Sequence, residues 1–583
     1  MPSKNSDLFS QEAFDFERKP FSDFGLFCRH VLDRSSAAQT STQELPLFAP
    51  ESSLVTIAET EPAGVASALS FSSRPIAAAT GFFEMSPPDG FPSQPVILAV
   101  VESISSAHTA SLLAVMREKN ARWGIITDSK IWRLHNKDVF SPFEHYYEID
   151  LPGLLDSRDA SESRFFSDFF TAAAHIRNSR KPSFLDSAFI ESEKAREALA
   201  SKLNEAIPRA VAAICKGFIR HERETTGAVP AGEGLDMIFR HSLVLVYRML
   251  LLMLLESRGT LPLDDPEYKR RSMTGFAAGA KAAFDSLSAD TPATYASWGA
   301  LESMFERAYR GDRDTGATPL TGEFFNPEQH PFLSRNRADD FHILQSIKEL
   351  NTAMESCGAD AGELHSCHLA EALSSVPMYN LRIAEEPLLR VIDRGRELCL
   401  PQSQSKWKTV IEKIDRGDVY LEKISNPALD PVSVPHKTAA ALIRATDARR
   451  DISFAAPPKF YAPFCVAGGQ LPLAAAVQAT ELIAASEPDR PFASCKNRAA
   501  QSSVFASGDN AYMSETARLV LWHFATSPGA PPPALEHKIS FGNPLPGTAI
   551  SDLFSSAVPD GEAAAAAMRE TLSAIAAEAI AAE

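Results

Sequence analysis

Short apolar runs alternate with turn residues in the N-terminal third, and this pattern predicts a mixed α/β domain. The runs PVILAVVES (95–103) and RWGIITDSKIWRLHN (122–136) are rich in β-branched and aromatic residues and predict strands. Asp128 and Ser129 interrupt the second run and predict a hairpin turn. SSAHTASLLAVMREKN (105–120) predicts a helix between the two runs. A strand, helix and strand in succession are typical of an α/β unit.

A helical pattern follows the polar, proline-containing link at 177–189 and predicts an all-α connector. Apolar residues recur every three or four positions in 192–221. The most apolar run, SLVLVYRMLLLMLLESRG (242–259), contains Arg248 and Glu256, so we expect a buried helix and not a membrane span. The predicted domains are residues 1–185, 186–400 and 401–583.

The third domain predicts a second α/β fold. Strand candidates such as ISFAA (452–456) alternate with alanine-rich helices after residue 401, and the tail at 562–583 is a strong helix former. The predicted fold class is therefore a multidomain α/β protein with a helical connector.

Composition narrows the class of protein. Hydrophobic residues make up 45% of the 583 residues, which is typical of a folded chain. The formal net charge of -17 argues against bulk electrostatic coating of nucleic acid and leaves room for a local basic groove. The N-terminal stretch lacks the apolar core of a secretory signal.

The cysteines predict reduced thiols in a cytoplasm. Their number is odd, and none has the spacing of a metal knuckle. His365 and His368 flank Cys367, but no second ligand pair accompanies them, so we predict surface helix residues and no zinc site. The seven cysteines are Cys28, Cys215, Cys357, Cys367, Cys399, Cys465 and Cys495.

Three ordered segments near the C-terminus carry a family resemblance. They are KFYAPFCVAGGQLPLAAAVQ (459–478), VFASGDNAYMSETARLVLWHFATSPG (504–529) and LEHKISFGNPLPG (535–547). In this order they resemble the cofactor half of an N6-adenine DNA methyltransferase of the type IIG restriction-modification class. Enzymes of that class join a nuclease, a helical connector and a methyltransferase on one chain. Residues 122–155 and 239–268 also resemble that class, in its nuclease and its connector.

The resemblance implies an S-adenosylmethionine site in a partial Rossmann-like class I methyltransferase domain. The family's Asp-Pro-Ala-Cys-Gly-Ser-Gly loop, laid on 462–468, retains three of its residues, while Ala462 and Val466 replace the acid and the first glycine. The cofactor-binding residues carried over are Pro463, Cys465, Gly468, Asp509 and Asn543.

The two replacements in this loop weaken the expected cofactor site. Losing a hydrogen bond to a charged group costs roughly 1.5–3 kcal/mol. A β-branched residue in a left-handed glycine position costs roughly 1–2 kcal/mol more. A micromolar site would fall to about millimolar affinity, so we expect weak or lost binding.

The same resemblance implies a Mg²⁺-dependent nuclease site in the first domain. Asp89, after two prolines, and Glu102 correspond to the catalytic, metal-binding acids, and we expect Asp89 on a turn and Glu102 on a buried strand. Ile104 occupies the lysine position, and loss of such a charge stabiliser typically costs on the order of 10²–10³ in rate. We therefore expect Mg²⁺ binding and cleavage to be lost. Without the family comparison, Asp89 is a turn residue and Glu102 a strand-end charge.

The catalytic motif of the family, Asn/Asp-Pro-Pro-Tyr/Phe, does not follow Gly547. The resemblance thus implies a shortened, degenerate relative that acts in DNA modification or phage defence without a complete active site. One alternative is the first half of a split methyltransferase/endonuclease, completed by a second polypeptide. The others are a decaying remnant and an unrelated α/β protein. The expected partners are DNA and such a second chain, without a membrane.

Two further groups have both a structural and a DNA-binding interpretation. Trp123, Trp132 and Tyr146 can stack on bases, but their alternation with aliphatic residues favours a strand core. EYKRRSM (267–273) is a basic turn that can contact phosphate or simply face solvent.

Overall fold

The computed structural model describes residues 3–10, 66–177, 182–423, 461–462, 469–527, 535 and 539–540, with gaps of a few residues inside the longer ranges. The chain forms two compact units. The first consists of Met1–Ala198 and Glu481–Cys495, and the second of Leu199–Thr480 and Lys496–Glu583. The described part is a mixed α/β protein, as the sequence predicts.

A seven-stranded mixed sheet forms the first unit, in the order β1-β7-β6-β5-β4-β3-β2. Within it β4 and β5 are parallel, and the other neighbouring strands are antiparallel. The strands are β1 (Ser3–Asn5), β2 (Ser72–Pro75), β3 (Phe82–Ser86), β4 (Val96–Val100), β5 (Trp123–Thr127), β6 (Ile131–Asn136) and β7 (Tyr146–Asp150). The first unit also contains α5 (Leu151–Ser157) and the 3₁₀ helix η2 (Ala172–His175).

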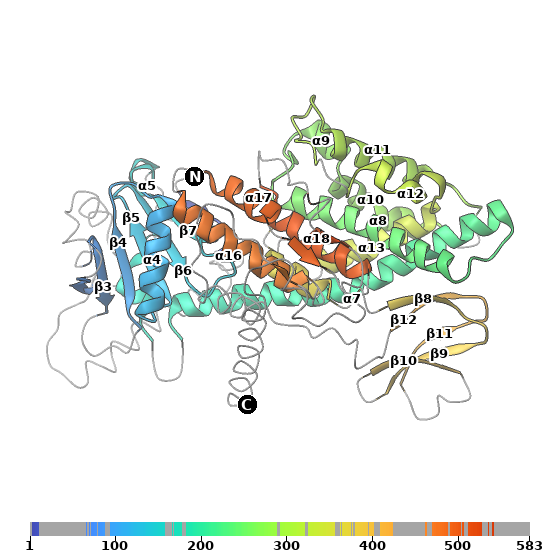
Figure 1. The fold of residues 1–583 in the computed structure, drawn as a ribbon, viewed down its shortest axis with the longest axis horizontal. Coiled ribbons are helices and arrows are strands. Elements are labelled where there is room, and N and C mark those ends of the chain that lie inside the picture. Colours follow the sequence, from blue (N-terminus) through green and yellow to red (C-terminus); the bar gives the residue numbers. More distant parts are fainter. Residues whose placement is uncertain are drawn as a thin grey trace, which may run out of the picture. The chain divides into compact units, whose positions relative to one another are not determined.

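Helix α4 (Ser106–Glu118) connects the two parallel strands and packs against β4 and β5 (Figure 1). Ser105 caps this helix by accepting a hydrogen bond from the His108 backbone N–H. Ser129 lies between β5 and β6 with φ of 74°, a left-handed geometry that suits a tight hairpin. The strands, helix and hairpin predicted between 95 and 136 are therefore confirmed.

Asp186 is the buried anion of the first unit, with 1% of its side chain exposed. It lies in the first turn of α7 (Phe184–Thr226) and accepts hydrogen bonds from Trp123 Nε1 at 3.1 Å, Arg122 at 3.1 Å and Arg177 at 2.5 Å. Burial alone would raise the pKa of this carboxyl, but the hydrogen bonds from Trp123 and Arg122 and the charge of Arg177 lower it. Asp186 thus fastens the start of α7 to strand β5.

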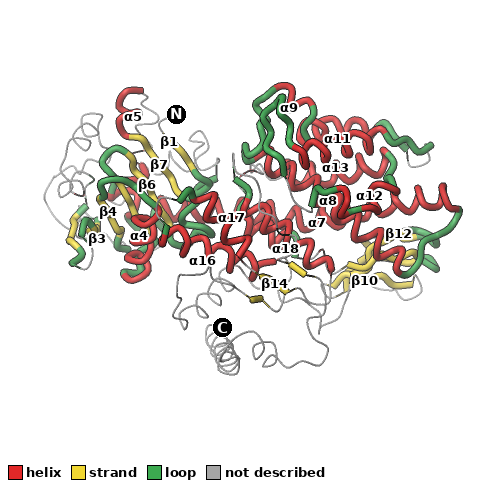
Figure 2. Tube along the Cα trace, turned by 45° about the horizontal axis from the view of Figure 1, so that its top comes forward, coloured by secondary structure: helices red, strands yellow, loops and turns green. Residues whose placement is uncertain are grey.

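The second unit is built around α8 (Glu233–Ser257), which packs against α10, α13, α18 and β8. Its apolar window is long enough to cross a membrane, yet 94% of that window is buried in the protein. The prediction of a buried helix over 242–259 is confirmed. The other helices are α9 (Pro266–Arg270), α10 (Met273–Asp285), α11 (Ala296–Arg310), α12 (Pro331–Arg335), α13 (Asp340–Glu355), α14 (Ser366–Ala372) and the 3₁₀ helix η3 (Pro327–Gln329). Figure 2 shows these helices in red.

Two charged residues of α8 are buried, and each contacts a neighbouring segment. Arg248 donates from Nε to the Phe324 carbonyl at 2.6 Å and lies over the rings of Phe305 and Phe325; burial lowers its pKa to about 9. Glu256 accepts hydrogen bonds from the backbone N–H groups of Met273 and Thr274, in the first turn of α10. The Glu256 carboxylate stabilises the positive N-terminal end of the α10 dipole. Burial raises the pKa of Glu256.

Strands begin earlier than the sequence pattern predicts. The expected all-helical segment reaches residue 400, whereas β8 starts at Tyr379 and pairs with β12, and β9 pairs with β10 and β11. Tyr379 and Leu381 of β8 are buried and alternate with less buried residues, so this strand has one covered face. The alternation is too short for the sequence alone to distinguish a strand from the helices that precede it. The bounds are β8 (Tyr379–Ile383), β9 (Leu388–Asp393), β10 (Arg396–Pro401), β11 (Thr409–Ile414) and β12 (Val419–Lys423).

The C-terminal part contains helices α16 (Gln470–Ser486), α17 (Phe492–Ser502) and α18 (Ala511–Ala525) and three short strands. The strands are β13 (Tyr461–Ala462), β14 (Val504–Ala506) and β15 (Ile539–Ser540). The predicted strand at 452–456 and the predicted helix at 562–583 lie outside the described residues.

We predict that Asp186→Asn destabilises the first unit by about 2–4 kcal/mol, because Arg122 and Arg177 lose a buried counter-ion. The loss is limited to this range because both arginines stay in contact with water. The folded pKa of Asp186 lies below its unfolded value of about 3.9. Its contribution is therefore complete above that value and is lost as the pH falls through the folded pKa. Thermal unfolding from neutral pH to about pH 3, with hydrogen exchange at β5 and the start of α7, checks this.

Asp138→Asn is the matched control, because Asp138 pairs with the same Arg122 at 2.9 Å but its side chain is 31% exposed. This variant should change stability by less than about 1 kcal/mol. Equal effects of the two substitutions would contradict the role assigned to Asp186.

Candidate functional site

The carboxyl edge of the C-terminal sheet is the place where the sequence predicts a cofactor. β13, β14 and β15 are neighbours in that order and are parallel, with Tyr461 opposite Val504 and Phe505 opposite Ile539. Helices α16 and α17 connect the first pair of strands, and α18 connects the second. In open parallel sheets, ligands bind outside the carboxyl ends of the strands.

The predicted cofactor residues follow these strand ends in sequence. Pro463, Cys465 and Gly468 come after β13, Asp509 after β14, and Asn543 after β15. All five residues lie outside the part of the chain that the structure describes. Their positions along the sequence, but not their side-chain geometry, can therefore be compared with the sheet.

Gly469 is the first described residue after this loop. Its φ is 72°, and a Cβ atom at this position would lie 2.9 Å from the Cα of Ala517 in α18. Only glycine combines a left-handed backbone with so close an approach at low cost. We call this left-handed glycine, where the start of α16 meets α18, the glycine corner.

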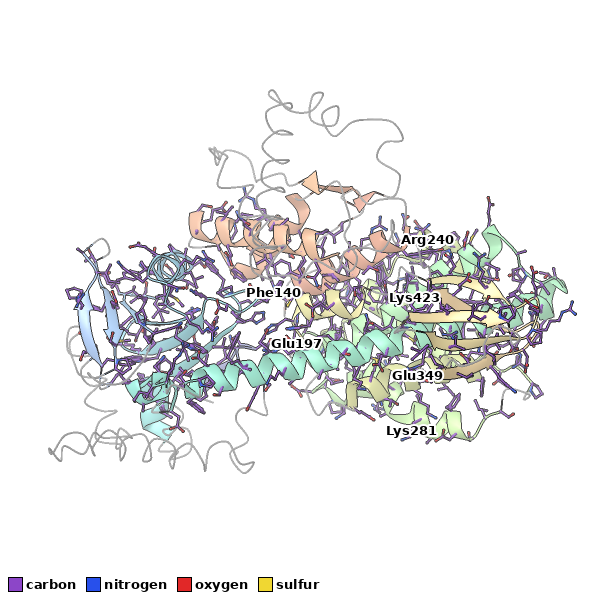
Figure 3. The ribbon with its side chains drawn as sticks, turned by 90° about the horizontal axis from the view of Figure 1, so that it is seen from below. Phe140, Glu197, Arg240, Lys281, Glu349 and Lys423 are labelled. Carbon is purple, nitrogen blue, oxygen red and sulfur yellow. The ribbon has the colours of Figure 1, made fainter. Side chains whose placement is uncertain are left out.

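Polar contacts hold α18 against α8. The Tyr247 hydroxyl lies 2.8 Å from the Thr516 hydroxyl, and burial raises the pKa of Tyr247. Arg240, which is labelled in Figure 3, donates to Glu515 at 3.1 Å. Glu515 also pairs with Arg518. The glycine corner therefore rests on a helix that is fixed to the centre of the second unit.

The structure corrects the predicted position of Glu102. Strand β4 ends at Val100, and Glu102 lies beyond it in an exposed bend, not on a buried strand. The sheet pairing stops because residues 101–105 turn toward the start of α4, which Ser105 caps. Asp89 lies outside the described residues, so its distance from Glu102, the other predicted Mg²⁺ ligand, is not defined. Ile104, at the lysine position, is half-buried.

Trp123 and Trp132 lie in the core of the first unit, as their alternation with aliphatic residues predicts. Trp123 is 4% exposed and Trp132 is fully buried. Tyr146 is only partly buried, and the Arg133 guanidinium lies 4.6 Å from the centre of its ring. The two tryptophans therefore cannot stack on bases without unfolding the sheet.

The basic segment at 267–273 is partly neutralised by its own acid. Both Arg270 and Arg271 form ion pairs with Glu267 within one turn of α9 and its cap. Surface pairs of this kind contribute little to stability, and here they reduce the net positive charge that a phosphate would meet.

The structure brings together three side chains that the sequence analysis places on a helix surface. His365 occupies the N-cap position of α14, and Cys367 and His368 lie in the first turn of this helix. Their relative exposures are 1%, 0% and 2%, so the prediction of surface residues is wrong. The helix is buried because it packs against α18, about 150 residues away in sequence. No local pattern indicates this burial.

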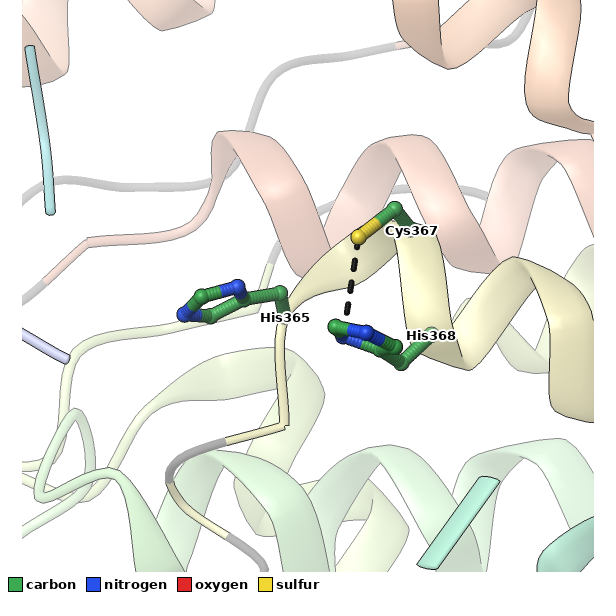
Figure 4. A group of neighbouring side chains, drawn as sticks. All are labelled: His365, Cys367 and His368. Carbon is green, nitrogen blue, oxygen red and sulfur yellow. Dashed lines mark hydrogen bonds between the residues drawn. The ribbon is translucent and has the colours of Figure 1, made fainter. Parts of the chain in front are cut away.

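This group, the His-Cys-His cluster, offers one sulfur and two nitrogen ligand atoms that all lie within 4.8 Å of one another. Cys367 Sγ lies 3.6 Å from His368 Nδ1. Figure 4 marks this contact with a dashed line. Imidazole nitrogen and thiolate sulfur are the ligands that zinc prefers in proteins. The close spacing His-Ser-Cys-His was the signal in the sequence, but without burial it predicts nothing.

We predict that Gly469→Ala loosens the contact between α16 and α18, because it adds backbone strain of roughly 1–2 kcal/mol and a steric clash with Ala517. Gly227→Ala is the control, since Gly227 has a similar φ of 69° but nothing within 4 Å of its Cβ position. Hydrogen exchange should accelerate in α16 and α18 only for Gly469→Ala. Equal or absent changes in the two variants would show that Gly469 is not in close contact.

The described residues thus contain three features: a three-stranded parallel sheet followed by the glycine corner, an exposed Glu102, and the buried His-Cys-His cluster. Comparison of the chain with protein-family models, with curated proteins and with solved structures found no match.

Proposed function

We propose that this chain is a DNA-modification or phage-defence component related to type IIG restriction-modification enzymes, with no complete active site of its own. In this proposal it binds DNA and acts as a scaffold in the cytoplasm. The observation that carries the proposal is the parallel order β13-β14-β15 with helical connections. Because a fold alone does not define an activity, the motifs at the strand ends must support the same conclusion.

The strand order agrees with one half of a doubly wound fold. In that fold the first three strands lie side by side in sequence order, and their carboxyl ends hold the nucleotide. Here each of the three motif segments contains one of three successive parallel strands, and its predicted cofactor residues follow the end of that strand. Motifs that matched by chance would have no reason to follow strand ends in this order.

The first unit supports the same family. Its sheet has one parallel pair, β4 and β5, joined by α4 and flanked by antiparallel strands. In our proposal this is a nuclease-like fold whose site lacks the catalytic lysine, because Ile104 stands in that position. Glu102 keeps an acid near the strand end, but one acid and an isoleucine do not provide the charge stabilisation that phosphodiester cleavage requires.

Restoring the cofactor loop tests the proposal directly. The double substitution Ala462→Asp and Val466→Gly returns the acid and the left-handed glycine, and should tighten S-adenosylmethionine binding by about 10²–10³-fold from about millimolar affinity. The control replaces Ala462 with Asn in place of Asp, which restores size without charge and should recover less. Calorimetric titration measures both.

Unchanged weak binding in the double variant would contradict a former cofactor loop. Cleavage or methylation of DNA by the unaltered chain alone would contradict the absence of a complete active site. Failure of the chain to bind DNA in a gel-shift assay at low salt would remove the scaffolding role.

A split enzyme is the second candidate, and the position of β13 favours it. Among the described residues β13 pairs with β14 alone, so it lies at the edge of its sheet. In a doubly wound fold the strand that begins the second half pairs with this edge. A second polypeptide with the Asn-Pro-Pro-Tyr motif can supply that strand by adding to the sheet edge.

Co-expression with the polypeptide encoded next to this chain tests the split enzyme. We expect the two chains to co-purify and the pair, but neither chain alone, to methylate adenine in DNA. The substitution Tyr461→Pro in β13 should weaken the association of the two chains, because proline cannot donate a backbone hydrogen bond to an added strand. Co-purification without methylation would favour the scaffolding role over the split enzyme.

A further inference from the structure

We propose that the His-Cys-His cluster of His365, Cys367 and His368 binds a divalent transition-metal ion of the zinc class. The proposal goes beyond DNA modification and does not depend on it. It rests on the identity, proximity and burial of three ligand side chains within one turn of α14.

The distances fit a tetrahedral metal. Zinc lies about 2.3 Å from sulfur and about 2.0–2.1 Å from imidazole nitrogen, so a tetrahedral site places the two ligand atoms about 3.6 Å apart. Cys367 Sγ and His368 Nδ1 are 3.6 Å apart. The ligand nitrogen of His365 is within 4.8 Å of both atoms.

The backbone around the cluster is fixed from several sides. Gln470 donates to the Cys367 carbonyl at 3.0 Å, and Arg258 donates to the Leu364 carbonyl at 3.1 Å. Ser366 hydrogen-bonds with His523 of α18 at 2.8 Å. Contacts of this kind orient ligands before the metal arrives, which raises metal affinity.

Burial keeps the three ligand side chains of the cluster away from bulk solvent. Two imidazoles and a thiol with exposures of 2% or less carry little apolar surface relative to aliphatic residues of the same size. A metal would use all three side chains of the cluster at once. Binding deprotonates the thiol, and the thiolate offsets part of the metal charge.

The three ligands leave a fourth coordination position for a solvent molecule, as in sites with three protein ligands. The mixture of one soft sulfur and two borderline nitrogens selects zinc or cobalt over magnesium and calcium, which prefer oxygen. The metal would hold His365 against the first turn of α14, and so stabilise the start of this helix, which packs against α18.

Cobalt substitution of the full-length chain tests the site. The purified protein is first stripped with a chelator and then titrated with Co²⁺, and its absorption is recorded. We expect tetrahedral d–d bands in the visible range and a thiolate-to-cobalt band in the near ultraviolet, saturating at one ion per chain. Added Zn²⁺ should displace Co²⁺ and raise the thermal midpoint, because it binds only the folded state.

Cys367→Ser should remove the near-ultraviolet band and the stabilisation by Zn²⁺, and His368→Ala should weaken Co²⁺ binding by at least about tenfold. Cys215→Ser is the matched control. Cys215 is a buried thiol in the same unit, and burial raises its pKa to about 12, so its loss should leave the spectrum unchanged. Circular dichroism of each variant before metal addition separates loss of a ligand from loss of the fold.

Absence of a thiolate-to-cobalt band in the folded wild-type chain would overturn the proposal. A band that persists in Cys367→Ser would also overturn it, because the metal would then lie at another thiol. Neither readout involves DNA or S-adenosylmethionine, so the metal site and the proposed function succeed or fail separately.

Discussion

Helix α8 is apolar on all sides, and such a helix is stable in water only when other segments of the protein cover it completely. In the second unit α10, α13, α18 and β8 provide that cover. Three of the polar side chains that α8 carries make defined contacts within this packing. Arg248 binds the Phe324 carbonyl, Glu256 holds the first turn of α10, and Tyr247 contacts Thr516 of α18. These contacts fix which neighbour lies at which level of the helix.

Helix α18 contacts both the glycine corner and the segment that carries the His-Cys-His cluster. Its Ala517 receives Gly469 at the end of the predicted cofactor loop, and its His523 holds Ser366 within the His-Cys-His cluster. A metal that stabilises α14 would therefore also stabilise the surface on which the glycine corner rests. Gly469 and the His-Cys-His cluster therefore depend on contacts with the same helix.

In the first unit, the residues that stabilise the sheet differ from those that a nuclease site would need. The sheet depends on buried side chains such as Trp123 and Trp132 and on the Asp186 network, all of which the structure retains. A nuclease would depend on charged groups at the end of β4, where Glu102 is exposed and Ile104 is apolar. The Asp186 network therefore does not involve Glu102 or Ile104.

The sequence alone determined the elements whose signals are local. The strands β4, β5 and β6, helix α4, the turn at Ser129 and the buried helix α8 follow from periodicity, turn residues and apolar length, which act over fewer than about 20 residues. The tertiary structure decided three other features: where β8 to β10 begin, that Glu102 lies in an exposed bend, and that His365, Cys367 and His368 are buried together. Each depends on a neighbour distant along the chain, such as α18 for the cluster. Burial is a property of the whole fold, and no local pattern of residues contains it.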